Sequence, residues 1–139
     1  MTGYDVHKAY SLYAGEDFLT SPRLLTEPRW ATDSSGWFWT KYKKDNAGHN
    51  LSDMADDNLF LRITYFVNGG FNGVQDRLRL LDRAYKVFGV ENGRIHIESI
   101  LGAALYNISN DSRSNMEKSL LKHFPNQEAI EEARRGLDT

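Results

Sequence analysis

The fold is decided by the stretch Arg62-Ile-Thr-Tyr-Phe-Val-Asn-Gly-Gly-Phe-Asn-Gly-Val-Gln-Asp-Arg77, which joins two apolar helical patterns through a glycine-rich turn. Glycine takes positive φ without strain, so Gly69 is suited to end the first helix abruptly and Gly73 to let the chain enter the second. Asn68 and Arg77 are then expected to project near the corner between the helices. The stretch therefore predicts a polar site on a helix–turn–helix corner.

Apolar residues repeat on both sides of this turn at spacings of three and four, which is typical of the buried face of an amphipathic helix. Two acids, Asp56 and Asp57, are expected to open the first helix, where they favour its dipole. The expected buried residues are Leu59, Ile63, Phe66 and Val67 in the first helix, and Val74, Leu78, Leu81, Tyr85 and Phe88 in the second, which ends at Gly89. In the second helix, Leu81→Ala is expected to cost about 2 to 5 kcal/mol.

The chain before residue 56 predicts two further helices. The first is expected over 6–14 with Gly15 at its end, and the second follows a loop at 21–28 whose last proline suits a helix start. From residue 29 to about 42, four apolar residues share one helix face, namely Trp30, Ala31, Trp37 and Phe38. Trp37 and Trp39 cannot share a face, so one of them is expected to pack inward. Residues 43–53 are polar and predict a surface loop.

The chain after Gly89 also predicts helices. Ile97, Leu101, Ala104, Leu105 and Ile108 favour one helix, although the alternation over 94–98 is also compatible with extended structure. Residues 107–115 are polar and turn-rich. Ser114 and Glu117 fit a capping box that opens a helix through His123, and a last charged helix follows Pro125 and ends at Gly136. We therefore expect a mainly α fold in a single domain.

Composition limits the class of protein. The 139 residues suffice for one compact domain, and 40% of them are hydrophobic, as in globular proteins. A net charge of −2 offers no basic field for nucleic acid. The chain has no cysteine and its four histidines lack a metal-ligand spacing, so no disulfide, metal site or cofactor is predicted. No signal peptide or membrane span is visible, and we expect a protein that is cytoplasmic as synthesised, with no membrane partner.

Five short motifs follow one another along the first two thirds of the chain. They are Met1-Thr-Gly3, Asp17-Phe-Leu-Thr-Ser-Pro-Arg23, Trp37-Phe-Trp39, Val67-Asn-Gly-Gly70 and Asp76-Arg77. In this order they resemble the C-terminal half of the family 19 glycoside hydrolases, the chitinases and related phage-type endolysins. The resemblance implies that residues 1–90 form the C-terminal lobe of a lysozyme-like chitinase fold. Residues 91–139 are expected to add a helical extension.

The resemblance implies inverting hydrolysis of β-1,4-linked amino-sugar glycans, in chitin or in cell-wall peptidoglycan, by two carboxyl groups. Both catalytic Glu of the family precede the matching residues, as in a truncated gene, so no catalytic residue is assigned in this chain. By position, Thr2 matches the hydroxyl residue that orients the water, Asn68 the turn amide that binds sugar, and Arg77 the arginine that organises the cleft charges. Val6 and His7 depart from the family's Asn and Tyr, which removes one sugar-binding amide.

The chain's own acids are poor substitutes for the missing pair. The groups considered are Glu16 with Asp17, Asp56 with Asp57, and Glu98 near His96. Adjacent residues on a helix or strand point in different directions, so the first two pairs cannot face one another across a sugar. The chain is therefore expected to be inactive alone.

Three functions are compatible with these observations. The first is a truncated family 19-like hydrolase that depends on an upstream hydrolase segment. The second is a noncatalytic module that binds amino-sugar glycans, and the third is a partner-binding protein, such as an inhibitor or immunity factor, that reuses the surface of the lobe. Structural roles are also open for the site residues, because Asn68 suits a helix C-cap and Arg77 suits an ion pair with Asp76 or Asp82.

Overall fold

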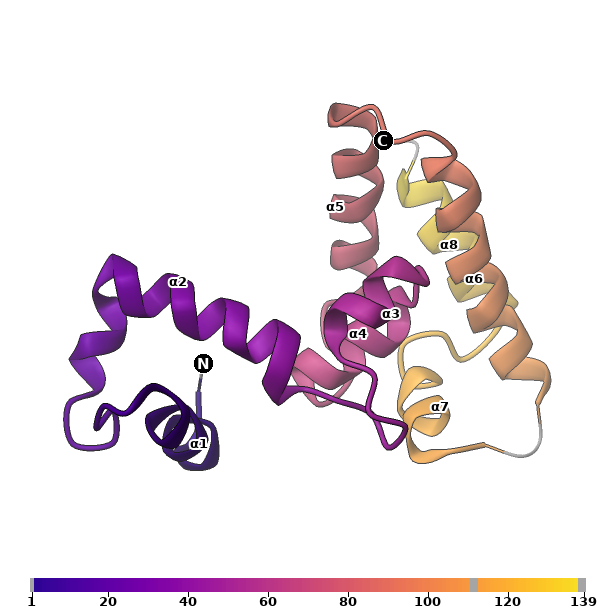
Figure 1. Ribbon diagram of the computed structural model, residues 1–139. Helices are drawn as coiled ribbons and strands as arrows, with labels where there is room; N and C mark the ends of the chain where they lie inside the picture. The colour runs from indigo at the N-terminus through magenta and orange to yellow at the C-terminus, as the bar shows by residue number, and fades with distance from the viewer. Residues whose placement is uncertain (1, 111–112, 138–139) are drawn as a thin grey trace. The chain divides into compact units, whose positions relative to one another are not determined.

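The structure is a computed structural model that describes residues 2–110 and 113–137, and it is mainly helical (Figure 1). Helices make up 70% of it, and no strand occurs in the described residues. The mainly α prediction is confirmed. None of the helices in this part of the chain combines the length and apolar character needed to cross a membrane.

The chain packs as two compact units, residues 1–54 and residues 55–139, rather than as the single domain expected from its length. The boundary falls within the short helix α3 (Leu51–Asp56). Each unit has its own hydrophobic cluster, one over residues 6–42 and one over residues 60–137, and this separation explains the division. Residue 90, the predicted limit of the family-like segment, lies between two helices that pack on each other; that limit concerns ancestry and stays a prediction.

The first unit follows the predicted helix order. Helix α1 (Tyr4–Ala14) ends at Gly15, whose φ of 75° is left-handed. A 3₁₀-helix, η1 (Pro22–Thr26), occupies the predicted loop, and α2 (Pro28–Trp37) starts at a proline, as expected. Helix α2 continues directly into a π-helical turn, η2 (Phe38–Tyr42), so the predicted helix reaches Tyr42 with a change of winding.

Aromatic rings form the core of the first unit. Tyr10, Phe18 and Trp37 are buried, and the Tyr10 ring lies 4.9 Å from that of Phe18 and 5.1 Å from that of Trp37. Trp37 is 7% exposed and Trp39 is 37% exposed, which confirms that one of the two packs inward. The buried Tyr10 hydroxyl donates a hydrogen bond of 2.6 Å to Asp33 Oδ2.

Two predictions around residue 51 are wrong, for one reason. Asn50 and Asp53 cap the start of α3 reciprocally, since each side chain accepts a hydrogen bond from the backbone N–H of the other at 2.9 Å. The helix therefore begins at Leu51, inside the predicted loop, and ends at Asp56. Asp56 and Asp57 thus precede α4 (Phe60–Asn68) instead of opening it, and Leu59 lies outside that helix and is exposed.

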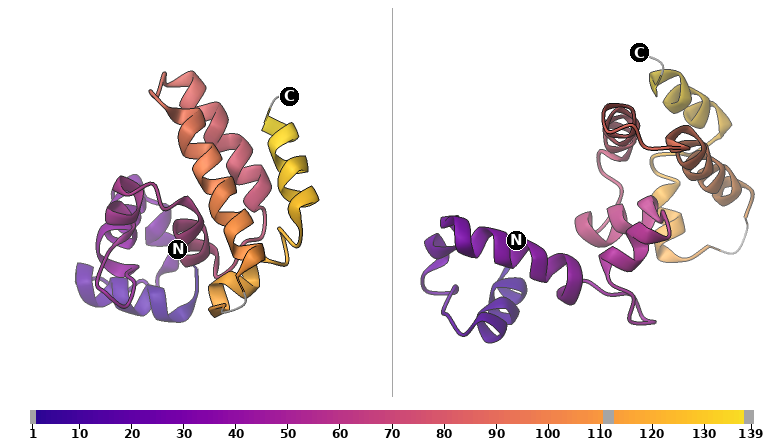
Figure 2. Two further views of the ribbon diagram at one scale, coloured as in Figure 1. Left: turned by 90° about the vertical axis from the view of Figure 1, so that its right-hand side faces the viewer. Right: turned by 45° about the horizontal axis from the view of Figure 1, so that its top comes forward.

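The second unit is built on three helices that lie side by side, α5 (Val74–Val87), α6 (Gly93–Ser109) and α8 (Gln127–Leu137) (Figures 1 and 2). Helix α6 is continuous from Gly93, so residues 94–98 are helical and not extended. The fully or nearly buried core comprises Phe71, Val74, Leu78, Ile97, Ile100, Leu101, Ala104, Leu120, Phe124, Ile130 and Leu137.

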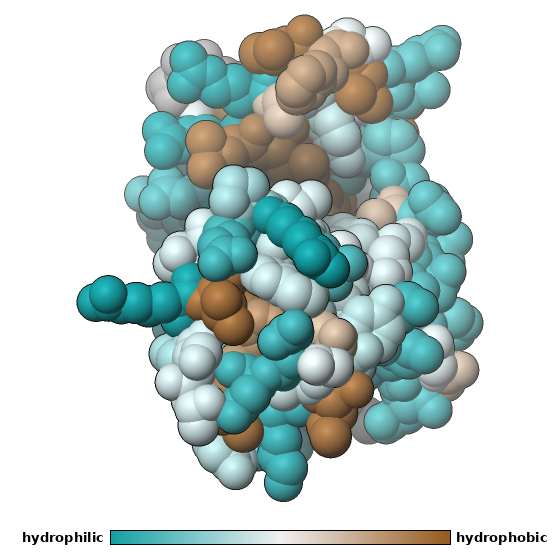
Figure 3. Space-filling view, turned by 60° about the vertical axis from the view of Figure 1, so that its left-hand side comes forward, coloured by the Kyte–Doolittle hydropathy of each residue, from teal (hydrophilic) through white to brown (hydrophobic). Residues whose placement is uncertain are grey.

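The turn between α5 and α6 places apolar side chains in solvent. Helix α5 ends at Val87, and the left-handed Gly89 turns the chain towards α6. Phe88, predicted to be buried, therefore lies outside the helix and is 80% exposed. Elsewhere in the unit, Val67 on α4 and Leu105 on α6 are also exposed. Figure 3 shows such apolar surface among the polar side chains on one face of the molecule.

Close backbone packing at Gly93 brings α6 against α5. A Cβ at this position would lie 2.7 Å from Cβ of Tyr85, closer than two such atoms approach, so a side chain here would separate the helices. The N-cap half of the predicted capping box is confirmed at α7 (Asn115–Leu120), because Ser114 Oγ accepts the N–H of Glu117. That helix ends at Leu120 and not at His123.

Burial on α5 supports a matched pair of substitutions. Leu78 is 1% exposed and Leu80 is 58% exposed on the same helix. We expect Leu78→Ala to lower the free energy of unfolding by about 2 to 5 kcal/mol, the range for a large-to-small change in a core. Leu80→Ala should change it by less than about 0.5 kcal/mol. Urea denaturation followed by circular dichroism measures both, and equal losses would contradict the placement of this helix. Leu81 is only partly buried, so Leu81→Ala should cost less than Leu78→Ala.

The Tyr10–Asp33 hydrogen bond predicts a pH dependence in the first unit. Burial, and then the bond to Asp33, raises the pKa of Tyr10 above its ordinary 10.0. A raised pKa stabilises the fold below pH 10, and this stability is lost as the pH rises above 10 because only the unfolded chain then releases the proton. Tyr10→Phe should cost about 1 kcal/mol at pH 7 and should show a shallower loss of stability between pH 10 and 11.

Tryptophan fluorescence reports this unit selectively, since Trp30, Trp37 and Trp39 are the only tryptophans in the chain. Denaturation is to be followed at pH 8 and pH 10.5 for both proteins. Tyr13→Phe, which changes a half-exposed tyrosine of the same helix, is the control and should keep the wild-type pH dependence. Parallel curves for wild type and Tyr10→Phe would contradict the assignment.

Candidate functional site

The corner between α4 and α5 has the backbone that the glycines predict. Helix α4 ends at Asn68, and Gly69 follows with a left-handed φ of 70°. Gly73, with φ 75°, precedes the first residue of α5. Gly69 is therefore the left-handed cap, and Asn68 has ordinary helical geometry, so the C-cap interpretation of Asn68 is wrong.

Arg77 is held against α4. Its Nε donates to Thr64 Oγ1 at 3.3 Å, and its guanidinium lies 5.8 Å from the centre of the Phe60 ring. Thr64 is fully buried and donates its own hydroxyl proton to the carbonyl of Phe60 at 2.9 Å. The expected pairs of Arg77 with Asp76 or Asp82 do not form, because Asp76 pairs with Arg79 and Asp82 pairs with Lys86 and Arg94.

Asn68 and Arg77 lie on one side of the corner. Thr64 and Asn68 are four residues apart on α4 and thus occupy adjacent turns of one face, and Arg77 reaches Thr64. Asn68 is exposed, and its Nδ2 donates to the carbonyl of Asn72 at 3.5 Å, which is a long bond. The corner therefore presents a loosely held carboxamide at the end of α4 and a fixed, partly buried guanidinium on α5.

Thr2, the third predicted site residue, belongs to the first unit, where it is exposed and precedes α1. Its predicted place at the edge of the same groove stays a prediction. The two departures from the family pattern have structural roles in that unit. Val6 packs against the aromatic cluster, and Nδ1 of His7 lies 2.8 Å from the carbonyl oxygen of Gly3 at the start of the helix.

Two carboxylates of the first unit, Asp17 and Asp45, are engaged in turns. Asp17 accepts hydrogen bonds from the Thr20 hydroxyl and from the N–H groups of Thr20 and Leu19, and these bonds lower its pKa. The backbone N–H of His49, with its side chain and the N–H of Ala47, lowers the pKa of Asp45 in the same way. A general acid needs a raised pKa to hold its proton at neutral pH, so neither group suits that role.

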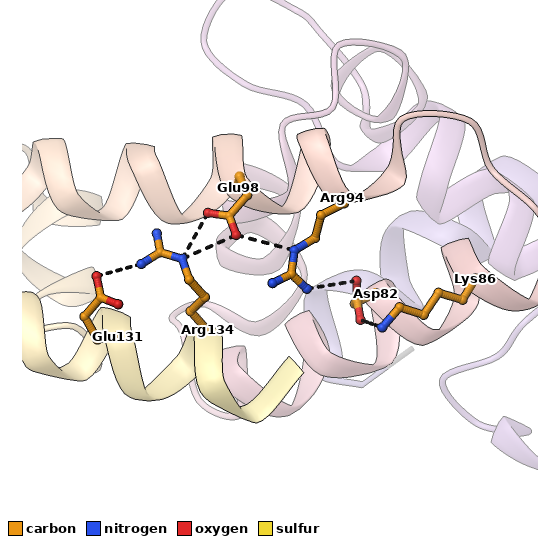
Figure 4. A network of polar contacts seen from close by, with 6 residues as sticks. All are labelled: Asp82, Lys86, Arg94, Glu98, Glu131 and Arg134. Carbon is orange, nitrogen blue, oxygen red and sulfur yellow. Dashed lines mark hydrogen bonds and ion pairs between the residues drawn. The ribbon is translucent and has the colours of Figure 1, made fainter. Parts of the chain in front are cut away.

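Glu98, another candidate acid, belongs to a network of ion pairs that joins α5, α6 and α8 (Figure 4). It accepts from Arg134 Nε at 3.1 Å and lies 3.4 Å from Arg94 Nε. At one end of this network, Glu131 lies 2.6 Å from Arg134. At the other end, the buried Asp82 lies 4.0 Å from Arg94 and 2.7 Å from Lys86. The hydrogen bonds that Arg134 donates to Glu131 and Glu98 raise the pKa of its guanidinium. Both guanidinium groups thus engage the Glu98 carboxylate, which serves to join α6 to α8.

Sequence reasoning missed this network. Its pairs within one helix, Asp82–Lys86 and Arg94–Glu98, have the spacing of four that was available as a signal. The link from Glu98 to Arg134 joins residues 36 positions apart, and it exists only because α6 packs on α8.

Within the described residues, no group of three or more His, Asp or Glu side chains is arranged to hold a metal ion. No protein-family model matches the chain, and no solved structure matches its fold.

Proposed function

We propose that this protein is a family 19-like protein that binds amino-sugar glycans at the α4–α5 corner and does not hydrolyse them by itself. The observation that supports the proposal best is the pairing of an exposed Asn68 carboxamide with a positioned Arg77 on one side of the corner. By resemblance, Asn68 occupies the position of the turn amide that binds sugar, and Arg77 that of the arginine that organises the cleft charges.

The chemistry of the corner suits an N-acetylated sugar. A carboxamide offers one acceptor and two donor hydrogens, which match the N–H, carbonyl and hydroxyl groups of such a sugar. The hydrogen bond from Asn68 to Asn72 is long, at 3.5 Å, and therefore weak, so a ligand can replace it at little cost in free energy. Arg77 is braced by Thr64 and Phe60, so it contributes donors without the entropic cost of ordering a free side chain.

The noncatalytic part of the proposal follows from the acids. Inversion needs two carboxyl groups about 6.5 to 9.5 Å apart, one of them protonated. Glu98 is paired with two arginines, and turn hydrogen bonds lower the pKa of Asp17 and of Asp45. Asp17 and Glu98, two of the acids considered as replacements, are therefore engaged in holding the fold.

Glycan binding should be weak and should depend on Asn68. Titration with a tetramer of N-acetylglucosamine, recorded by amide NMR, should give a dissociation constant near millimolar, about −4 kcal/mol, because a single corner covers only part of a sugar chain. Shifts should cluster over residues 68–77. Asn68→Ala should weaken binding about fivefold, the effect of losing about one hydrogen bond.

Asn115→Ala is the matched control, since Asn115 is an exposed asparagine on α7 and should leave the affinity unchanged. Absence of any shift at 10 mM sugar, or equal weakening by both substitutions, would refute the binding proposal. Shifts confined to other surfaces would have the same meaning.

The isolated chain should release no new reducing ends from chitin oligomers or peptidoglycan. The assay requires protein purified free of host lysozyme, with Glu98→Gln and Asp17→Asn prepared alongside. Turnover in the wild type that either substitution abolishes would show that the chain has its own catalytic acid and would contradict this part of the proposal.

A further inference from the structure

A cavity of about 340 Å³ opens between α4, α6 and α7 in the second unit. Its walls are mainly apolar and include Phe60, Phe71, Ile100, Ala103, Met116 and Leu120. Tyr106, which is 70% exposed on α6, also lines it. Asn68 and Arg77 are not among its lining residues, so the cavity is a separate feature from the corner.

The size and walls of this cavity define the ligand. Sites for small molecules are typically concave, mostly apolar and at least about 300 Å³ in volume, with a few polar groups that set orientation. An apolar cavity of about 150 Å³ holds a single benzene ring, so one ring would leave more than half of this cavity unfilled. Three aromatic walls and the thioether of Met116 favour a flat aromatic ligand of about two rings.

The polar groups at the cavity favour a ligand that donates a hydrogen bond. The carboxylates of Asp57 and Glu117 outnumber the guanidinium of Arg62 among the charged lining residues. Asn107 also lines the cavity and is 4% exposed; its Nδ2 donates to the Glu117 carbonyl at 2.9 Å, whereas its buried Oδ1 has no hydrogen-bond partner among the described residues. A buried acceptor without a donor is destabilising, and a ligand N–H or O–H would relieve it. An anionic ligand would instead meet two negative charges.

We propose that the cavity between α4, α6 and α7 binds a small aromatic ligand of about two rings that carries an N–H or O–H donor and no negative charge. This site is independent of glycan binding. It gives the protein a second ligand of a different chemical class.

Three related probes test the ligand class on the full chain. N-phenyl-1-naphthylamine carries the N–H donor on a two-ring naphthalene, with one further phenyl ring, and its fluorescence rises in apolar surroundings. It should bind saturably with one site per chain. Its N-methyl derivative lacks the donor and should bind about fivefold more weakly. 8-Anilino-1-naphthalenesulfonate keeps the rings and the N–H but adds a negative charge, and it should bind at least tenfold more weakly.

Substitutions on α6 test the location. Ala103 is exposed at the cavity, so Ala103→Trp fills it without displacing a core side chain, and Ser99→Trp is a second variant of the same kind. Both should weaken N-phenyl-1-naphthylamine at least tenfold. Leu105→Trp places the same ring two residues away on the same helix, outside the cavity lining, and should stay within twofold of wild type. Circular dichroism and thermal midpoints verify that each variant is folded.

The outcomes separate clearly. Loss of binding in the two cavity variants together with retention in Leu105→Trp supports the site. Wild-type affinity in a folded Ala103→Trp or Ser99→Trp overturns it, because the probe then binds another apolar surface such as the exposed turn at Val87 and Phe88. Equal binding of the sulfonate and the neutral amine would overturn the proposed ligand class.

Discussion

The left-handed backbone at Gly69 and Gly73 is the constraint on which the second unit depends. Residues with a Cβ lose about 1 to 2 kcal/mol in this conformation, and open space surrounds both positions, so the requirement is for backbone freedom and not for room. Between the two glycines, Phe71 is 1% exposed and its ring lies 5.6 Å from that of Tyr65. The glycines let the chain reverse, and burial of Phe71 fixes the direction in which α5 leaves.

The rest of the second unit packs around a core that three helices share. Helices α5, α6 and α8 share one core, and the absence of a side chain at Gly93 lets α6 approach Tyr85. Apart from the buried Asp82, the ion-paired side chains along the three helices are partly exposed, so these pairs contribute little to stability beside the apolar packing, but they engage Glu98. Phe60 links the corner to the cavity, since its ring faces Arg77 on one side and lines the cavity as well.

Sequence patterns predicted the elements better than their limits. The spacing of Val74, Leu78 and Leu81 placed α5 correctly because a fully amphipathic stripe has few alternatives, and the capping box at Ser114 has a local mechanism that needs no tertiary contact. Phe88 was assigned to the core because it continues that stripe. Helix α5 instead ends at Val87, one residue before Phe88, and the left-handed Gly89 follows. The start of α3 was missed because the polar composition of residues 43–53 favoured a loop, although Asn50 and Asp53 within it cap a helix.

The candidate site was predictable only in part. The grouping of Asn68 and Arg77 followed from the turn, but the contact of Arg77 with Thr64 depends on how α5 crosses α4, which no local pattern specifies. Thr2 belongs to the other unit, so its predicted place at the edge of the groove stays a prediction. The cavity draws its lining from three helices spread over more than 50 residues, and it arises from packing alone.

Intermolecular nuclear Overhauser effects between the N-acetyl methyl groups of a bound N-acetylglucosamine oligomer and the protein test the central claim most directly. The account predicts contacts to amide and side-chain protons within residues 68–77, including the Asn68 carboxamide. Contacts to the first unit alone, for instance to the indole of Trp30, with none to the corner at saturating sugar, would contradict it.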